Sequence, residues 1–308
     1  MSESPLAANP YEVLGVAPTA SDGDLKKAYR RRLREAHPDT GGSSAEFDRV
    51  QQAWLRVGTV QARQVYDAGG DSSSGGAEAW SYGAAGGGAR RGDTRPNARS
   101  TGHPGGWYRE QYLRLMREWA GRGTELDDPY DPRLVRTAPR EIKHLLAAAV
   151  AEERTATALA TLGMGFTIWH DVAAGSSPED KVDHVVLGPT GLWAVLSEDW
   201  GGPVQVKRGD LIGEGITSGE RPLHQLGARA KVVARGARAR FSALVIVVED
   251  SQAPTSLAEL GNVRGAQGML VERSRLVNLI RTGLPGVGVG GTDLFEVRTR
   301  LQSSIRFV

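Results

Sequence analysis

The chain has 308 residues, of which 40% are apolar and 24% charged, so it has the composition of a folded protein with room for two domains. Its 38 Lys and Arg nearly balance its 36 Asp and Glu, and the formal net charge of +2 gives no global preference for an anionic partner. The absence of cysteine excludes disulfides, thiolate catalysis and cysteine-ligated zinc. It is compatible with a reducing cytoplasm, where we expect the protein. No apolar stretch approaches the ~18–20 residues that a membrane-spanning helix needs, and the first residues lack the pattern of a secretory signal.

Residues 1–70 are expected to form a small helical domain. Tyr11 and Leu14 lie three positions apart on one face of a short helix, which Gly15 ends. Two longer helices follow, and a connection of about six residues predicts that they pack antiparallel as a hairpin. The apolar stripe of the first long helix is Leu25, Ala28, Tyr29, Leu33 and Ala36, and that of the second is Phe47, Val50, Trp54 and Val57.

The first long helix carries a local excess of positive charge. Residues 24–36 contain six bases against Asp24 and Glu35, a local charge of +4 in an otherwise balanced chain. Like charges four residues apart repel, so this clustering has no folding rationale and points to a partner. The cations that lie off the apolar stripe are Lys26, Lys27, Arg30, Arg31 and Arg34.

The tripeptide His37-Pro38-Asp39 follows this basic helix directly. Proline has no N–H and a fixed φ, so Pro38 ends the helix and stiffens the loop. Taken alone, the tripeptide is adequately explained as a turn. Its neighbours favour a functional role over a simple turn, because the loop lies beside a clustered cationic face and between two helices with matching apolar stripes.

Five elements in order, "PYEVLGV", the basic helix, "HPD", "F..VQQAW" and "VYDAGG", resemble the J domain of DnaJ-type co-chaperones over roughly residues 9–70. The resemblance implies a partner, a DnaK-type (heat-shock seventy) ATPase chaperone, whose ATP hydrolysis the His-Pro-Asp loop triggers. It implies that the basic helix face docks on an acidic surface of that partner, that Asp39 meets an arginine there and that His37 orients the loop. Since the ATP chemistry belongs to the partner, we expect no enzyme activity, cofactor or catalytic residue in this chain. The expected partner-binding residues are His37, Pro38, Asp39, Lys26, Lys27, Arg30, Arg31 and Arg34.

Residues 71–106 are expected to form a flexible linker. The stretch is mostly Gly, Ser, Ala and Arg and has almost no aliphatic residues, so it cannot bury enough apolar area to offset its ordering entropy. Residues 107–138 then comprise a helix, over 107–123, and a connecting segment broken by "DDPYDPR". The expected fold class is therefore multidomain, with an all-α hairpin, a Gly-rich disordered linker and a C-terminal α/β domain over residues 139–308.

The C-terminal domain alternates helical and strand patterns. A helix and strand precede "KVDHVVLGPTGLWAVLSEDWGGPVQVKRGDLI", which reads as three strands joined by turns. A helix over "RPLHQLGARAKVVARGAR" and a continuous apolar strand, "FSALVIVVED", follow. "NVRGAQGMLVERSRLVNLIRTG" is strand-like and then helical. The pattern predicts an α/β sheet with flanking helices.

That order, with "EERTATAL", "VDHVVLGPTGLWAV", "EDW" and "HQLGARAKV", resembles the nuclease-related domain, a branch of the restriction-endonuclease-like fold, over roughly residues 140–285. The resemblance implies an acid on one strand and Glu-x-Lys on the next, which hold a divalent cation and stabilise charge. Asp183 stands at the first position, but Leu196-Ser197-Glu198 replaces Glu-x-Lys, and Gln225 matches the family's helix glutamine. A degenerate site at Asp183, Glu198 and Gln225 is therefore expected, in a domain that binds a client or partner, and no metal is expected.

Other readings of this domain stay open at the sequence level. Asp183 and Glu198 could still bind a metal weakly, and Gln205-x-Lys207 is a remote substitute for the missing triplet, so a metal-dependent nuclease is the alternative function. A nucleic-acid-binding protein is a further one, supported only by scattered arginines at 229, 235, 238 and 240. The spacing of His170, His184 and His224 forms no metal pattern, and Asp183 beside His184 is explained equally well as a satisfied polar pair.

Overall fold

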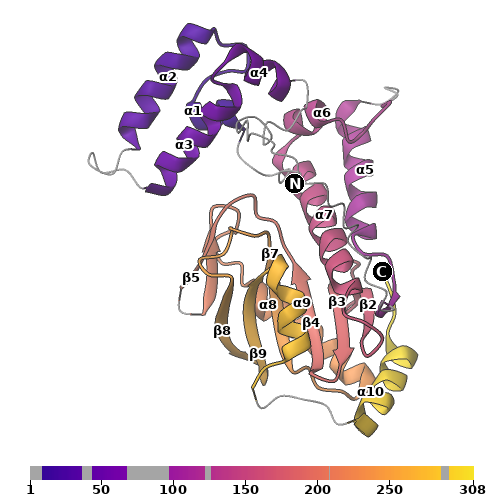
Figure 1. Ribbon diagram of the computed structural model, residues 1–308. Coiled ribbons are helices and arrows are strands. Elements are labelled where there is room, and N and C mark those ends of the chain that lie inside the picture. Colours follow the sequence, from indigo (N-terminus) through magenta and orange to yellow (C-terminus); the bar gives the residue numbers. More distant parts are fainter. Residues whose placement is uncertain (1–8, 37–43, 68–96, 122–125, 208, 286–290) are drawn as a thin grey trace, which may run out of the picture. The chain divides into compact units, whose positions relative to one another are not determined.

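The computed structural model describes residues 9–36, 44–67, 97–121, 126–207, 209–285 and 291–308. The chain divides into two compact units (Figure 1). Unit 1 comprises residues 1–90 and 123–139, and unit 2 comprises residues 91–122 and 140–308. The chain therefore passes from one unit to the other at three places, and each unit is described separately below.

Unit 1 is built from short helices around one apolar cluster. Asn9 and Glu12 form a capping box at the first helix, and Gly15 ends it in the left-handed conformation with φ 68°. Ser21 caps the second helix by accepting a hydrogen bond from the amide of Asp24. The helices are α1 (Pro10–Leu14), α2 (Asp22–Glu35), α3 (Ser44–Val57), α4 (Val60–Asp67) and α6 (Pro132–Thr137).

The two predicted stripes meet in the core of unit 1. Val50 and Val57 of α3 are buried with Leu25 of α2, and the rings of Tyr29 and Trp54 stack with centroids 4.4 Å apart. Burial of these apolar side chains, at about 25 cal/mol per Å² removed from water, is what holds the helices together. The expected helical hairpin is confirmed.

Unit 2 is a seven-stranded mixed sheet with helices on both faces. The strand order is β1-β2-β3-β4-β7-β9-β8, and a separate two-stranded sheet pairs β5 with β6. Strand β7 is buried along its whole length, as its unbroken apolar sequence predicts. The strands are β1 (Arg99–Thr101), β2 (Thr167–Ala173), β3 (Lys181–Gly188), β4 (Gly191–Ser197), β5 (Val204–Lys207), β6 (Asp210–Gly213), β7 (Ala243–Val248), β8 (Leu257–Val263) and β9 (Ala266–Glu272).

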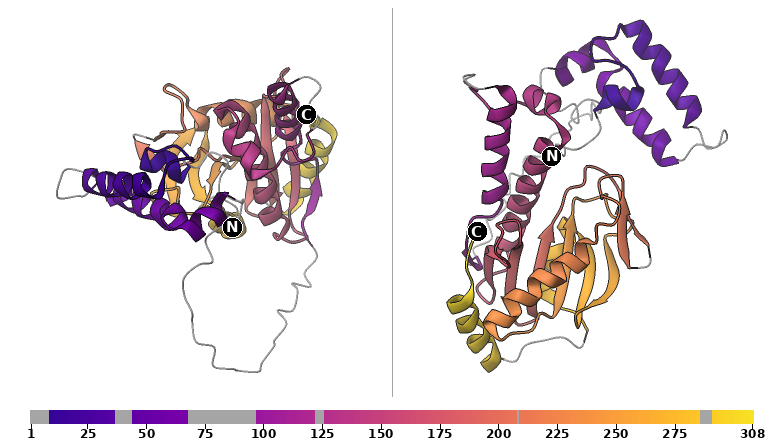
Figure 2. Two further views of the ribbon diagram at one scale, coloured as in Figure 1. Left: turned by 90° about the horizontal axis from the view of Figure 1, so that it is seen from above. Right: turned by 180° about the vertical axis from the view of Figure 1, so that it is seen from behind.

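The helices of unit 2 form two layers, with the sheet between them (Figure 2). Leu226 and Ala230 of α8 pack against one face of the sheet, and Leu159 of α7 and Ile280 of α9 pack against the other. Helix α5 lies along α7, with Tyr112 and Met116 fully buried. The helices are α5 (Gly106–Ala120), α7 (Arg140–Ala160), α8 (Pro222–Ala237), α9 (Arg273–Thr282) and α10 (Gly291–Ser304).

The fold differs from the sequence prediction at the end of the expected linker. Residues 97–106 lie in the range predicted as flexible, but they contain β1. This strand pairs in parallel with β2, with Arg99 opposite Thr167 and Thr101 opposite Trp169. A Cβ at Gly102 would lie 2.3 Å from the carbonyl oxygen of His170, so this glycine permits a close backbone approach that the composition alone does not reveal. The predicted linker between 71 and 96 lies outside the described residues.

Further elements were not predicted: α10, a fourth strand (β6) where three were expected over residues 181–212, and the two described next. Strand β8 pairs with β9 through a two-residue turn, Arg264-Gly265, and α6 forms within the segment expected to be a simple connection. Within the described part of the chain, no helix combines the length and apolar character needed to cross a membrane.

Candidate functional site

The cationic face of α2 is exposed as the sequence predicts. Lys26, Lys27 and Arg30 point away from the buried stripe of Leu25 and Ala28. Arg31 lies 3.9 Å from Glu35, and Arg34 donates a hydrogen bond from Nε to the carbonyl of Arg30 at 3.2 Å. An exposed ion pair such as that of Arg31 with Glu35 contributes only ~0–1 kcal/mol to stability.

His37, Pro38 and Asp39 lie outside the described residues, so the structure does not test their expected role. The structure does describe the two helices on either side of these residues, α2 and α3. Helix α2 ends at Glu35, with Ala36 as its C-cap, and α3 begins at Ser44. The expected loop therefore connects two helices whose stripes share one core.

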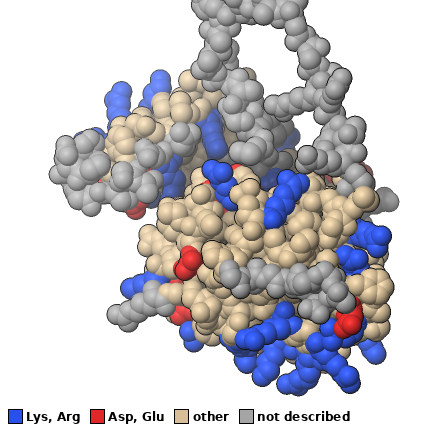
Figure 3. All heavy atoms as spheres, turned by 60° about the horizontal axis from the view of Figure 1, so that its bottom comes forward, with Lys and Arg blue, Asp and Glu red and all other residues tan. Residues whose placement is uncertain are grey.

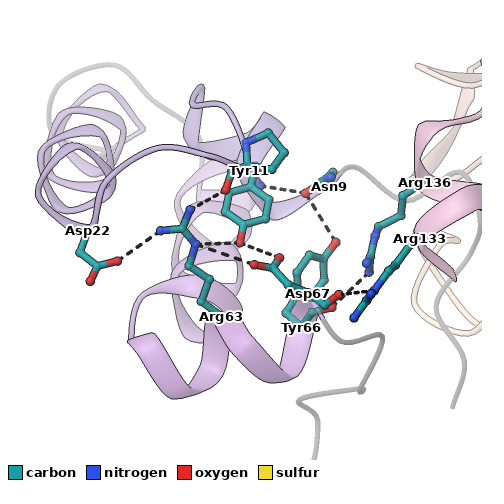
Figure 4. A network of polar contacts seen from close by, with 9 residues as sticks. Asn9, Tyr11, Asp22, Arg63, Tyr66, Asp67, Arg133 and Arg136 are labelled. Atoms are coloured by element: carbon teal, nitrogen blue, oxygen red, sulfur yellow. Dashed lines mark hydrogen bonds and ion pairs between the residues drawn. The ribbon is translucent and has the colours of Figure 1, made fainter.

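A polar network around Arg63 holds the other end of this helical frame (Figure 4). Arg63 of α4 donates to the hydroxyl of Tyr11 at 3.2 Å and to Asp22 at the start of α2, also at 3.2 Å. The Tyr11 hydroxyl in turn donates to Asp67 at 2.8 Å. Burial and this hydrogen bond raise the pKa of Tyr11 to about 12. The network ties α1, α2 and α4 together away from the exposed cations.

Helix α6 adds a second layer of contacts to α4, although about 65 residues of sequence separate the two. Arg133 donates from Nε to the carbonyl of Asp67 at 2.9 Å, and Arg136 donates to the carbonyl of Tyr66 at 3.2 Å (Figure 4). The guanidinium of Arg136 also lies 4.8 Å from the centroid of the Tyr66 ring. Carbonyls in the last turn of a helix lack intrahelical partners, so the two arginines cap α4.

Unit 2 contains a buried charged group that the sequence did not predict, which we call the Lys181 cluster: Lys181, Glu152, Asp171 and Asp183. Lys181 of β3 bonds Glu152 of α7, lies 2.6 Å from Asp171 of β2, and lies 3.3 Å from Asp183 of its own strand. Its ammonium also lies 4.7 Å from the centroid of the Tyr108 ring. All four charged side chains are at most 3% exposed.

The charged groups of this cluster shift one another's pKa values. Burial lowers the pKa of Lys181, but the surrounding carboxylates, Asp183 first, outweigh it and hold the pKa above its usual value. Burial raises the pKa of Glu152 well above its usual value, and the charge of Asp183 raises it further. One ammonium therefore faces three carboxylates, and burial among them favours the protonated form of Glu152.

The Lys181 cluster continues into a chain of buried hydrogen bonds. Asp183 accepts from the amide of Ser197 at 2.7 Å, and the Ser197 hydroxyl lies 3.1 Å from Nε2 of His184. The Nδ1 atoms of His184 and His170 lie 2.7 Å apart, and Nε2 of His170 lies 2.6 Å from the hydroxyl of Ser100. Burial lowers the pKa of His170 to about 4 and that of His184 well below its usual value, so both rings are neutral and only one Nδ1 carries the shared proton.

The expected degenerate site is only partly assembled. Asp183 is 2% exposed in β3, and Glu198 follows the end of β4 close enough for the charge of Asp183 to act on it. Burial, and then that charge, raise the pKa of Glu198 to about 8. Gln225 lies on an exposed position of α8 and has no described contact with either acid. Gln205 and Lys207 lie in the separate sheet of β5 and β6, away from the seven-stranded sheet.

The residues at this site do not fit the divalent cation that a nuclease of this kind holds. Leu196, at the position of the first missing ligand, is 5% exposed and packs in the apolar cluster beneath α8. The ammonium of Lys181 already takes the space between the carboxylates. Among the described residues, no group of three or more His, Cys, Asp or Glu side chains is arranged to hold a metal ion. His224 lies apart, 3.8 Å from Asp210 and 44% exposed.

One signal in the sequence could have indicated the Lys181 cluster. In "KVDHVVLG" a lysine and an aspartate stand two positions apart in an otherwise apolar strand, and such positions share one face. The contributions of Glu152 and Asp171 could not be found in this way, because they come from a helix and a neighbouring strand.

Comparison with known proteins assigns both domains. Residues 9–67 match the model of the DnaJ domain, and residues 147–248 match that of the Nuclease-related domain. Over the first, the chain is 46% identical across 66 residues to Chaperone protein DnaJ 1 of Cutibacterium acnes, an alignment that covers 21% of this chain and 17% of that protein.

Two further relatives match the same region. The chain is 46% identical across 72 residues to Chaperone protein DnaJ of Leifsonia xyli subsp. xyli, covering 22% of this chain and 20% of that protein. It is 44% identical across 57 residues to the DnaJ protein homolog of Cucumis sativus, covering 18% of this chain and 14% of that protein. The chain thus carries a DnaJ domain and a nuclease-related domain, and it spans at most a fifth of the length of these three relatives.

Proposed function

We propose that this protein is a co-chaperone, which binds a DnaK-type chaperone through its DnaJ domain and stimulates the ATP hydrolysis of that partner in the cytoplasm. The observation that carries the proposal is the exposed cationic face of α2, directly before His37-Pro38-Asp39, in a domain whose relatives are named as chaperones. Clustered cations steer a protein toward an acidic surface and fix its register there. Asp39 supplies a carboxylate for a charge-assisted bond worth about 1.5–3 kcal/mol.

The test is single-turnover ATP hydrolysis by a DnaK-type chaperone in the presence of the full chain. We expect the wild-type protein to accelerate hydrolysis and His37→Gln to abolish the acceleration. His224→Gln is the matched control, because it makes the same chemical change at an exposed histidine of the nuclease-related domain. Equal acceleration by wild type and His37→Gln would overturn the proposal.

For the nuclease-related domain we propose binding of a client or partner without phosphodiester cleavage. Two observations support this. The residue at the position of the first ligand of Glu-x-Lys is a buried leucine, and the residue at the position of its lysine is Glu198, an acid with a raised pKa. The only buried lysine near the carboxylates, within the described residues, is bonded to three of them and cannot move to a phosphate without leaving those charges unpaired.

This second proposal is tested by incubating the full chain with single-stranded and duplex DNA and with RNA, in Mg²⁺ and then in Mn²⁺. No products above the buffer control are expected. Cleavage that disappears in Asp183→Asn would show that the domain is an active metal-dependent nuclease, and the proposal would then be wrong. The result leaves the ATPase test untouched, because the two proposals concern different domains.

A further inference from the structure

We propose that a groove in unit 2, lined by none of the residues of the two expected sites, binds the phosphate backbone of single-stranded nucleic acid. The groove is about 380 Å³ in volume and lies between the second half of α8 and the turn that joins β8 to β9. Ala230, Ala234 and Ala239 form part of its floor. Lys231, Arg240 and Arg264 stand among its lining residues, and no Asp or Glu does.

The positive charge extends beyond the groove itself. Arg235 and Arg238 are exposed on the same stretch of chain as Lys231 and Arg240, and Figure 3 shows Lys and Arg side chains gathered over this end of the molecule. We call these five residues, Lys231, Arg235, Arg238, Arg240 and Arg264, the groove cations. None of the five forms an ion pair with a described carboxylate. The sequence from 221 to 248 contains no Asp or Glu at all.

The turn between β8 and β9 brings the last of these charges into place. Arg264 and Gly265 have φ of 54° and 82°, as a tight two-residue hairpin turn requires. A Cβ at Gly265 would lie 2.8 Å from Nη2 of Arg240, so the guanidinium of Arg240 packs against this glycine. The fold thus places Arg240 beside the turn that carries Arg264, two cations that are 24 positions apart in the sequence.

Stabilisation of the helix end explains only part of this arrangement. Cations in the last turn of a helix interact favourably with its dipole, and this accounts for Arg235 and Arg238 at the end of α8. Lys231 stands six positions before that end, and Arg264 belongs to another element. Lys231 and Arg235, four positions apart, repel each other by ~0.2–0.5 kcal/mol. Repulsion without a compensating acid indicates an anionic ligand.

The dimensions favour a chain of phosphates over a single one. At 1.5 Å per residue, Lys231 and Arg238 are about 10 Å apart along the axis of α8. Phosphates follow one another about every 3.4 Å along one strand of a B-form duplex and at wider intervals along an extended single strand, so this length spans more than one phosphate. Four of the five groove cations are arginines, whose planar fork binds phosphate oxygens in pairs.

The floor favours a single strand over a duplex. Alanines 230, 234 and 239, with the buried Phe241, give the groove an apolar base. Unpaired bases offer apolar faces that such a surface can cover, whereas a duplex keeps its bases stacked inside and presents mainly phosphates. Arg229, which the sequence grouped with Arg235 and Arg238, is not part of this site, because its charge acts on Glu198 instead.

The test measures fluorescence anisotropy of a labelled oligothymidylate titrated with the full chain over a range of salt concentrations. We expect the triple variant Lys231→Gln/Arg240→Gln/Arg264→Gln to bind at least tenfold more weakly at low salt. Because a single strand releases about 0.7 counterions per phosphate contact, the slope of log affinity against log salt should fall by about two. The matched control is Arg99→Gln/Arg117→Gln/Arg275→Gln, three exposed arginines on β1, α5 and α9.

Further experiments distinguish loss of charge from damage to folding, and nucleic acid from other anionic ligands. Arg240→Lys/Arg264→Lys keeps the charges and should keep the salt slope; an equal loss in this variant would mean that folding was damaged, and the proposal would fail. It also fails if the control variant loses as much affinity as the groove variant. Competition by polyglutamate or by anionic lipid vesicles as effective as that by oligothymidylate would overturn the choice of nucleic acid. Stimulation of the DnaK-type ATPase should be unchanged in the groove variant.

Discussion

The two domains of this chain keep different parts of what their families share. The DnaJ domain keeps the exposed residues: a cationic face on α2 and the His-Pro-Asp tripeptide after it, on a small helical core. The nuclease-related domain has a mixed sheet between helices, while Leu196 and Glu198 stand where the sequence resemblance leads us to expect an acid and a lysine. A fold does not by itself fix a function, so function has to be inferred from the side chains at the site.

The Lys181 cluster lies beside the expected acid position, Asp183, and includes it. Charges buried in a sheet are costly unless they are paired, and a divalent cation would pair the carboxylates of a nuclease. Here an ammonium does so, and it donates to Glu152 and to Asp171. In this domain the buried carboxylates are thus paired by a side chain of the same polypeptide.

The largest effect is expected from removing the ammonium of Lys181, which tests whether it stabilises the buried carboxylates of this domain. Lys181→Ala leaves three buried carboxylates without their cation, and we expect the free energy of unfolding to fall by about 3–5 kcal/mol. Urea unfolding of the full chain, followed by fluorescence of the buried Trp169 and Trp193, measures this loss. Lys207→Ala, at an exposed lysine of β5, is the matched control and should change stability by less than about 0.5 kcal/mol.

The same variant tests whether the ammonium stands in for a metal. In Lys181→Ala the carboxylates of Glu152, Asp171 and Asp183 surround a space that oxygen-binding cations favour. Mn²⁺ should therefore raise the unfolding midpoint of the variant and leave that of the wild-type protein unchanged. Equal stabilisation of both proteins would mean that a metal binds elsewhere and that Lys181 is an ordinary structural lysine.

A second prediction concerns Glu198, the acid at the lysine position. Its pKa of about 8 lies above the usual value of 4.5, so the folded state binds a proton more tightly than the unfolded state between these values. Its contribution to stability is therefore present below pH 4.5 and is lost as the pH rises through 8. Glu198→Gln imitates the protonated form and should match wild type near pH 5.

At pH 9 the same variant should be more stable than wild type by on the order of 2 kcal/mol, a value discounted for the partial exposure of the side chain. Thermal or urea unfolding at several pH values measures the difference. Glu259→Gln, at an exposed position of β8, is a control of the same chemistry. A difference between Glu198→Gln and wild type that does not change with pH would contradict the assignment.

The smallest effect is expected in the DnaJ domain, from the loss of a contact between α6 and α4. Arg136→Ala removes a hydrogen bond to the carbonyl of Tyr66 and a stacking contact with its ring, and should cost about 1 kcal/mol. Hydrogen exchange should accelerate in the last turn of α4 and stay unchanged in α2. Arg114→Ala on α5 provides a matched loss of an arginine. Equal protection of α4 in both variants would show that α6 does not stabilise it.

Much of the fold followed from local patterns. The stripes of α2 and α3, the helix end at Gly15, and the continuous apolar strand β7 are short-range signals that the structure confirms. Helix α6 also had a signal that was overlooked, because Asp131 and Pro132 are a favoured N-cap and first helical residue.

Other elements had no local signal to read. Strand β1 has three exposed residues and depends on its partner β2 for its hydrogen bonds. The turn before β9 uses an arginine where such hairpins usually place Asn, Asp or Gly, so nothing marked the end of β8. Both the Lys181 cluster and the groove cations join residues from separate elements, and only the assembled sheet brings them together.

The capping of α4 by α6 has a consequence for the order of events during synthesis. The carbonyl of Tyr66 accepts a hydrogen bond from Arg136, which lies 70 positions later in the chain and is therefore synthesised later. At about 5–20 residues per second, the ribosome adds that arginine some 4–14 s after the tyrosine. Helix α2 makes its described contacts within residues 9–67, so the cationic face is complete earlier. A nascent chain would therefore present the cationic face of α2 before its own helical unit is fully capped.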